Sequence, residues 1–542
     1  MTFARRRPLS TKQIKEQTVF IHTANDDRDV AAPRRKPHRP GLGPAVAVSA
    51  GLLALTATVG APVAYGEDVT LVLGGTGLSV PNPPPGFIVG GTDKFVTPNF
   101  PGFTSAHAQG VYTPEQLYPL TGVSSLTLDQ SVAAGANTLN NAILRQVADG
   151  NHVVVLADSQ SSVVASEVMR LLAALPADQQ PSANELSFVL LVDPDNPNGG
   201  LFARFPDLAF PALGLTFDGA TPPDTIYPTV VYTLEYDGAS DYPQYPINIL
   251  ADLNAIAGFL FVHPTAGNLS PEQIASAIEL PTDPSYGTAT TYYMVPTEHL
   301  PLLEPLRALP IIGNPLANLV EPDLRILVNL GYGDPDFGYS TGPANVPTPA
   351  GFLPTIDLNE LLTDLVKGAQ LGWNDAVGSM TLETLGSTFS AAGTGSPLDI
   401  LTGVTGISAP PVPIPTIVPG DTVGNMISVA QALGTNTLAN LSMALGINAA
   451  AFLPPVQLGV EAVTTLPWVN ISALLSATDA LAGGDFGGFI NTIGALPGED
   501  ITIGLFAALM FADNILNAVT ADLVAFQGAI DGGLEILSAF VP

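Results

Sequence analysis

The feature that most constrains the fold is a series of short apolar segments, rich in β-branched residues, that alternate with segments of helical spacing. Continuous apolar runs of this length suit strands buried on both faces of a parallel sheet, and helices between them predict βαβ units. The expected strands are 69–73, 153–156, 186–192, 230–236 and 290–295, and the expected helices are 125–147, 161–175 and 247–261. We therefore expect an α/β fold, a three-layer sandwich around a mostly parallel sheet.

Basic residues concentrate at the start of the chain. Ten of the 17 lysines and arginines fall within the first 39 residues, and an uncharged run rich in Ala, Val, Leu and Gly follows at 44–64. A basic segment before an apolar one is typical of an export signal, and about twenty apolar residues can also span a bilayer as an anchor. We expect residues 1–66 to direct export, cleaved or as an anchor, and the remaining chain to act in the cell envelope or outside the cell.

The rest of the chain divides by composition. Residues 67–340 carry the strand and helix pattern and form the expected α/β domain. Segments rich in Pro and Gly follow at 342–354 and 409–419. They separate stretches rich in Ala, Gly and Leu, so we expect 341–542 to be mainly helical and to serve as a cap or a lipid-contacting region.

The apolar run 501–520 raises the question of a second membrane segment. It contains Asp513 near its centre. An aspartate in the middle of a membrane-spanning helix costs about 2.5–3.5 kcal/mol on insertion scales. We therefore expect an amphipathic packing helix here.

The strong negative charge excludes one class of partner. From Glu67 onward seven basic residues stand against 44 acidic ones, and the whole chain has a formal net charge of −31. A surface of this charge repels phosphate backbones and anionic headgroups, so we expect no nucleic-acid partner. The chain has no cysteine, and its six histidines form no HxH or HExxH pattern. The sequence thus implies no metal ion and no other cofactor.

The strongest local signal is a serine between a strand and a helix. The apolar run 152–157 leads into Asp158-Ser159-Gln160-Ser161, and a helical pattern starts at once. A tight strand-to-helix turn exposes the serine hydroxyl above the sheet, and the helix N-terminus adds donors for an oxyanion. Ala157 and Ser161 stand where the GxSxG pattern has glycines. Ser159 is therefore a candidate nucleophile, and an ordinary helix N-cap is the competing interpretation.

A glycine-rich turn follows the first expected strand. Gly74-Gly75-Thr76-Gly77 stands where an α/β hydrolytic fold supplies backbone amides to an oxyanion. We expect Gly75, Thr76 and Gly77 to form the oxyanion hole together with Gln160, the residue after the serine. A plain tight turn is the alternative.

An acid and a base follow in the chain. Asp241 ends a GxxD after a late strand, where a carboxylate would orient a histidine, and Asp237 is its close rival. His263 follows the third helix, and His299 is the competing base. The order Ser, Asp, His is the one expected of α/β-type serine hydrolases. The sequence predicts a serine hydrolase that uses Ser159, Asp241 and His263.

Several short blocks of residues occur along the chain in an order that a known family shares. They are Gly74-Gly-Thr-Gly77, Asp158-Ser-Gln-Ser161, Tyr236-Asp-Gly-Ala-Ser-Asp-Tyr-Pro243, the run Pro246 to Gly258, Val262-His-Pro264 and the run Tyr292 to Leu303. In this order they resemble the PE-PPE domain family of mycobacteria and their relatives, which are cutinase-like serine α/β-hydrolases. The resemblance covers about residues 69 to 335.

The resemblance implies an α/β-hydrolase fold with Ser159 as nucleophile and His263 as base, and it places the acid within 236–241. The layout resembles the subgroup that has an N-terminal export segment and no PE or PPE module. For that subgroup it implies a lipid or glycolipid ester substrate. The reaction is then hydrolysis by a carboxylesterase or lipase, or transfer of fatty acyl groups between trehalose-type glycolipids, and both pass through an acyl-enzyme.

Some alternatives stay open at this stage. A non-catalytic envelope protein that keeps the fold for binding or structure is the rival from another class. Contact with the membrane surface of the envelope is compatible with the sequence. The oligomeric state does not follow from it.

Overall fold

The structure is a computed structural model that describes residues 66–78, 81–122, 124–309, 313–379, 406–419, 422–451 and 453–540. All described residues belong to one compact unit of the chain. The expected export or anchor segment at 44–64 lies outside the described residues.

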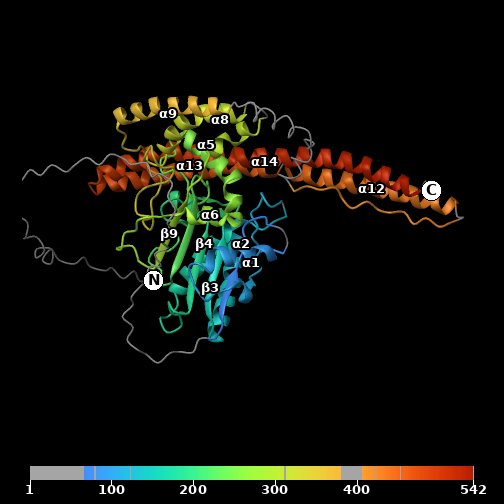
Figure 1. Cartoon of the computed structure of the whole chain (residues 1–542), viewed down its shortest axis with the longest axis horizontal. Coiled ribbons are helices and arrows are strands. Elements are labelled where there is room, and N and C mark those ends of the chain that lie inside the picture. Colours follow the sequence, from blue (N-terminus) through green and yellow to red (C-terminus); the bar gives the residue numbers. More distant parts are fainter. Residues whose placement is uncertain are drawn as a thin grey trace, which may run out of the picture. The chain divides into compact units, whose positions relative to one another are not determined.

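A seven-stranded sheet forms the centre of the fold (Figure 1). Its strand order is β2-β1-β3-β4-β7-β9-β8, and all neighbours pair in parallel except β8 with β9. The strands are β1 (Asp68–Val72), β2 (Ala108–Gly110), β3 (His152–Asp158), β4 (Leu186–Leu191), β7 (Thr229–Leu234), β8 (Ile278–Glu279) and β9 (Thr290–Val295). A separate antiparallel pair is formed by β5 (Ala209–Phe210) and β6 (Leu215–Thr216). The five long strands confirm the strand pattern that the sequence predicts.

Helices cover both faces of the sheet, which makes the expected three layers. Alternate residues of the strands pack with α2 (Leu128–Ala148) and α3 (Gln160–Ala173) on one face. The other face packs against the one-turn segment η1 (Thr92–Val96), and α1 (Pro85–Gly91) and α6 (Pro271–Ala275) lie at the edge of the same apolar cluster. Strands that are apolar on both faces thus occupy the middle layer.

Helices beyond the sheet complete the described chain. They are α4 (Leu201–Arg204), α5 (Ile249–Phe261), α7 (Glu304–Arg307), α8 (Gly313–Asn329), α9 (Leu358–Ser379), α12 (Thr422–Ala451), α13 (Leu453–Ala482) and α14 (Phe486–Phe540). The last three confirm the helical C-terminal region, and α14 packs against both α12 and α13. Glycines let α9 approach α8 closely, because a Cβ on Gly372 would lie 2.1 Å from the carbonyl oxygen of Leu319.

The C-terminal helices share an apolar cluster with the α/β domain. Ile503 of α14 is buried in the same cluster as Phe202 and Phe217, and Leu466 of α13 packs at its edge. The run 501–520 lies within α14, so the expected helix is present. Of the helices in the described part of the chain, none combines the length and apolar character needed to cross a membrane.

Candidate active site

Ser159 occupies the turn between β3 and α3. Its φ of 58° and ψ of −119° are unusual for a residue other than glycine, and backbone strain of this kind is concentrated at functional sites. Two hydroxyls hold the turn: Ser161 Oγ accepts from the amide of Asp158 at 2.7 Å, and Ser162 Oγ donates to the carbonyl of Ala157 at 3.2 Å. Ser161 and Ala157 are fully buried, so the crowded turn accommodates both in place of glycines.

His263 lies directly beside the serine. The chain leaves α5 at Phe261, and His263 begins a short 3₁₀ helix, His263–Asn268. Its Nε2 lies 2.7 Å from Ser159 Oγ, within hydrogen-bond distance. The ring of Phe259, one turn earlier, stacks on the imidazole with ring centroids 5.3 Å apart. The packing and the hydrogen bond fix the orientation of the imidazole.

Asp237 holds the other nitrogen of the imidazole. His263 Nδ1 lies 2.9 and 2.8 Å from the two carboxylate oxygens. The carboxylate is fully buried and also accepts from the amide of Ala239 and from the hydroxyl of Ser240. Because those donors fix the carboxylate, the imidazole keeps the tautomer that presents a lone pair to Ser159.

The structure corrects the preference for Asp241. Its backbone amide donates to the carbonyl of Asp237 at 2.7 Å, which turns the chain inward, and its side chain accepts from the amide of Tyr236 at 2.9 Å. The carboxylate therefore closes the turn, and among the hydrogen bonds of the described residues none joins it to His263. Of the two rivals, it is Asp237 that the structure brings to the histidine.

Electrostatics favour a charged imidazole at this site. Burial lowers the pKa of His263, but the negative charge and hydrogen bond of Asp237, with a further contribution from Asp158, raise it by more. The net pKa lies above the ordinary value. An imidazole that has accepted a proton from the serine is thus stabilised, as a general base requires.

The expected oxyanion donors lie close together but differ in availability. A Cβ on Gly75 would lie 3.3 Å from Cβ of Ser159, so the glycine turn packs against the serine. Thr76 Oγ1 donates to Gln160 Oε1 at 2.7 Å and ties the turn to the start of α3. Within the described residues, the amides of Thr76 and Gln160 have no protein acceptor. The amide of Gly77 already donates to the carbonyl of Glu115 at 3.4 Å, so it is the least available of the four.

A cavity of about 410 Å³ opens beside the serine. Its size lies within the range of about 300–1,000 Å³ that small-molecule sites occupy. Ser159, His263 and the glycine turn are among its lining residues. Apolar side chains make most of the remaining wall, among them Leu78, Leu117, Leu120, Leu128, Val163, Leu201, Phe202, Leu215, Phe217, Phe259 and Leu260. Such a wall suits an acyl chain.

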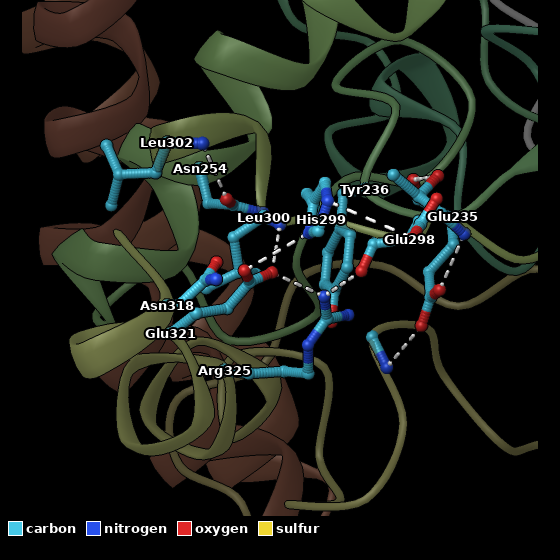
Figure 2. A network of polar contacts seen from close by, with 12 residues as sticks. Glu235, Tyr236, Asn254, Glu298, His299, Leu300, Leu302, Asn318, Glu321 and Arg325 are labelled. Atoms are coloured by element: carbon cyan, nitrogen blue, oxygen red, sulfur yellow. Dashed lines mark hydrogen bonds and ion pairs between the residues drawn. The ribbon is translucent and has the colours of Figure 1, made fainter. Parts of the chain in front are cut away.

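His299, the competing base, lies in a different network (Figure 2). Its Nδ1 is 3.3 Å from Glu321, which also pairs with Arg307 and, at 2.7 Å, with Arg325. Arg325 in turn donates to the hydroxyl of Tyr236, the residue before Asp237. The network joins the turn after β7 to α8, and it brings no serine to His299 among the contacts of the described residues.

Sequence reasoning missed two side chains of the site. Phe259 carries no local signal, because an aromatic on an apolar helix is ordinarily core. Asp158 lines the cavity beside Ser159, although its position at the end of a buried strand predicts only a turn residue. Both can be recognised as parts of the site only from the fold, which brings α5 and the glycine turn next to Ser159.

Together, the parallel sheet, the strained serine turn and the Ser–His–Asp chain define the α/β-hydrolase type of fold and site. The PE-PPE domain model matches residues 104–333. The chain is 41% identical over 465 residues to Esterase PE16 of Mycobacterium tuberculosis, covering 86% of this chain and 80% of that protein. The chain belongs to the PE-PPE domain family.

Two further relatives come from the same organism. The uncharacterized PPE family protein PPE28 is 40% identical over 455 residues, which cover 83% of this chain and 65% of that protein. The diacyltrehalose acyltransferase Chp2 is 34% identical over 199 residues, which cover 36% of this chain and 54% of that protein. The chain thus spans four fifths of PE16 but less than two thirds of the other two relatives.

Proposed function

We propose that this chain is a serine esterase that hydrolyses lipid or fatty-acyl esters through an acyl-enzyme on Ser159. The observation that carries the proposal is the line of hydrogen bonds from Ser159 through His263 to Asp237 beside an apolar cavity. The similarity to Esterase PE16 supports the same class of reaction.

The first half of the reaction forms the acyl-enzyme. Ser159 Oγ attacks the ester carbonyl carbon while His263 Nε2 takes the hydroxyl proton, and Asp237 stabilises the imidazolium. The oxyanion of the tetrahedral intermediate accepts from the amides of Thr76 and Gln160. The bond between carbonyl carbon and ester oxygen then breaks, and the departing alcohol takes the proton from His263.

The second half releases the acyl group. A water molecule attacks the acyl carbon and gives its proton to His263. The bond to Ser159 Oγ breaks, Oγ regains the proton from His263, and the carboxylic acid leaves. Serine, histidine and aspartate return to their starting protonation states.

A second candidate, acyl transfer, is favoured by one observation, the similarity to the diacyltrehalose acyltransferase Chp2. It uses the same acyl-enzyme, but a sugar hydroxyl takes the place of water. Apolar walls that exclude water from the acyl-enzyme would favour this outcome. The two reactions are separated by supplying a lipid ester with and without a sugar acceptor. The yields of free fatty acid and of the new ester are then compared.

The experiment that tests the proposal is hydrolysis of p-nitrophenyl esters of increasing chain length by the wild type and by Ser159→Ala. We expect turnover by the wild type and a loss of at least about a thousandfold in the variant, because the nucleophile is gone. Equal turnover by both proteins would contradict the assignment of Ser159 as the nucleophile. Circular dichroism of the variant checks that the fold is intact.

We further propose that the chain works in the cell envelope after export. The support is the basic start followed by the apolar run 44–64, together with the lipid-ester chemistry proposed above. Deletion of 44–64 should leave the protein in the cytosolic fraction of a host cell. An envelope or secreted fraction that is unchanged by the deletion would contradict the proposal.

A further inference from the structure

Asp158, the residue before Ser159, has surroundings that the mechanism does not explain. It lies at the last position of β3, lines the cavity and is only 9% exposed. Neither of its carboxylate oxygens accepts a hydrogen bond from a residue that the structure describes, and Oδ1 is completely buried. A carboxylate in an apolar cavity is costly unless a donor satisfies it.

The other polar side chains that line this cavity already have protein partners. Thr76 donates to Gln160, Gln160 donates to Ser131, and Thr121 accepts from a backbone amide. Ser159 and His263 bond to each other. Among the residues lining the described cavity, Asp158 is therefore the polar group without a partner, so we expect the substrate to supply one.

The carboxylate lies close to the reacting centre. A Cβ on Gly75 would lie 3.2 Å from Asp158 Oδ2 and 3.3 Å from Cβ of Ser159. The carboxylate and the serine thus flank the same glycine. A donor that reaches Asp158 must be only a few bonds from the ester that Ser159 attacks.

The charge state of Asp158 sets what it can recognise. Burial raises its pKa to about 6, an effect that His263 opposes and Asp237 reinforces. At neutral pH the group is still mainly ionised, so it only accepts hydrogen bonds. The partner must be a donor, and a hydrogen bond to a charged acceptor is among the stronger ones.

Resting on the proposed function, we propose that Asp158 forms a hydroxyl-binding subsite for the alcohol part of the ester. The subsite accepts a hydrogen bond from a free hydroxyl on the carbon next to the one that carries the ester oxygen. Partially acylated glycerol and partially acylated sugars share this chemistry. The substrate class is then an acylated polyol rather than a simple alkyl ester.

The test compares two octanoyl esters that differ by one hydroxyl, ethyl octanoate and 2-hydroxyethyl octanoate. The wild type should show a kcat/KM about tenfold higher for the hydroxyethyl ester, the size expected of one hydrogen bond to a charged group. In Asp158→Asn the ratio should fall below about twofold, since the charged acceptor is lost. Any change in His263 alters both esters alike and cancels in the ratio.

Glu115→Gln is the matched control. Glu115 is buried beside the same turn, and its raised pKa of about 8, caused mainly by burial, keeps it neutral. It does not line the cavity. The preference for the hydroxyethyl ester should therefore survive in this variant, and its loss there would mean that the effect comes from the turn rather than from Asp158.

A binding measurement keeps the test independent of turnover and of one variant's folding. In Ser159→Ala, 2-hydroxyethyl octyl ether should bind about tenfold more tightly than ethyl octyl ether. Asp158→Ser added to this background should remove the difference. Equal binding of the two ethers by Ser159→Ala would overturn the subsite.

The outcomes separate the subsite from the proposed function. Turnover of both esters without a preference, or equal losses on both in Asp158→Asn, overturns the subsite and leaves the esterase standing. Turnover of neither ester overturns the esterase, and the ether comparison in Ser159→Ala then decides the subsite by itself. A stronger Asp158-dependent preference for octanoylcholine than for the hydroxyethyl ester would assign the group to a cation instead. Glycerol mono-octanoate and octanoyl-trehalose then show which polyol fits better.

Discussion

The protein contains two histidine–carboxylate pairs whose surroundings differ. His263 contacts Asp237 at 2.8 Å, and its second nitrogen meets Ser159. His299 contacts Glu321 at 3.3 Å, but its side chain is 41% exposed and two arginines share the same carboxylate. The first pair can move a proton to and from a hydroxyl at a cavity. The second joins two segments of the fold, which shows that a histidine beside a carboxylate is not by itself a catalytic pair.

The largest difference between the pairs should appear on removing each histidine. His263→Gln should lower kcat/KM by about 10⁵-fold, because the serine loses its base. His299→Gln should stay within about twofold of the wild type. Ester hydrolysis by both variants measures this, and a comparable loss in His299→Gln would reverse the assignment of the two histidines.

Replacing each aspartate of the turn after β7 should separate the carboxylate that contacts His263 from the one that does not. Asp237→Asn should lower kcat by about 10³–10⁴-fold, since an amide favours the wrong tautomer of His263. Asp241→Asn should act mainly on stability, because its carboxylate accepts from the amide of Tyr236 and not from the imidazole. The measurements are kcat and the midpoint of urea unfolding for both variants. A larger fall of kcat in Asp241→Asn than in Asp237→Asn would contradict the structure.

Glu321→Gln should break the second pair with little effect on chemistry. Burial alone would raise the pKa of Glu321, but the amide of Leu300 and the charges of Arg325 and Arg307 lower it on balance. A depressed carboxyl pKa contributes stability above the unfolded value of about 4.3, and this contribution disappears as the pH falls. We expect a loss of about 3 kcal/mol at neutral pH from urea unfolding. An unchanged free energy of unfolding at neutral pH, or a decrease only at acidic pH, would show that the network adds little stability.

The pH dependence should show the smallest but most specific effect. The pKa of His263 is raised, so kcat/KM should fall on the acid side with a midpoint above the value of about 6.5 for an unperturbed histidine. Asp158→Asn should move this midpoint downward, because one negative charge near the imidazole is gone. A midpoint that stays at the unperturbed value in both proteins would contradict the proposed electrostatics.

Much of the fold was predictable because hydrophobic periodicity reports burial directly. The apolar run 290–295 coincides with β9, and the helix expected at 247–261 appears as Ile249–Phe261. The short strands β2 and β8 escaped prediction, since two or three residues carry no period. The contact of α9 with α8 also escaped, because it depends on glycines whose close approach only the fold reveals.

The site was predictable in its order but not in every side chain. Ser159 and His263 follow from their positions after a strand and a helix. Asp237 and Asp241 lie four residues apart in one turn, and only the backbone path decides which carboxylate faces the imidazole. The unpartnered carboxylate of Asp158 likewise emerges only when the glycine turn is folded over it.

Covalent labelling with a fluorophosphonate shows directly whether Ser159 is the nucleophile and His263 its base. We expect one adduct per chain, found on Ser159 by peptide mapping, and we expect labelling to be strongly slowed in His263→Gln but not in His299→Gln. An adduct on another serine, or labelling that persists in Ser159→Ala, would contradict this assignment.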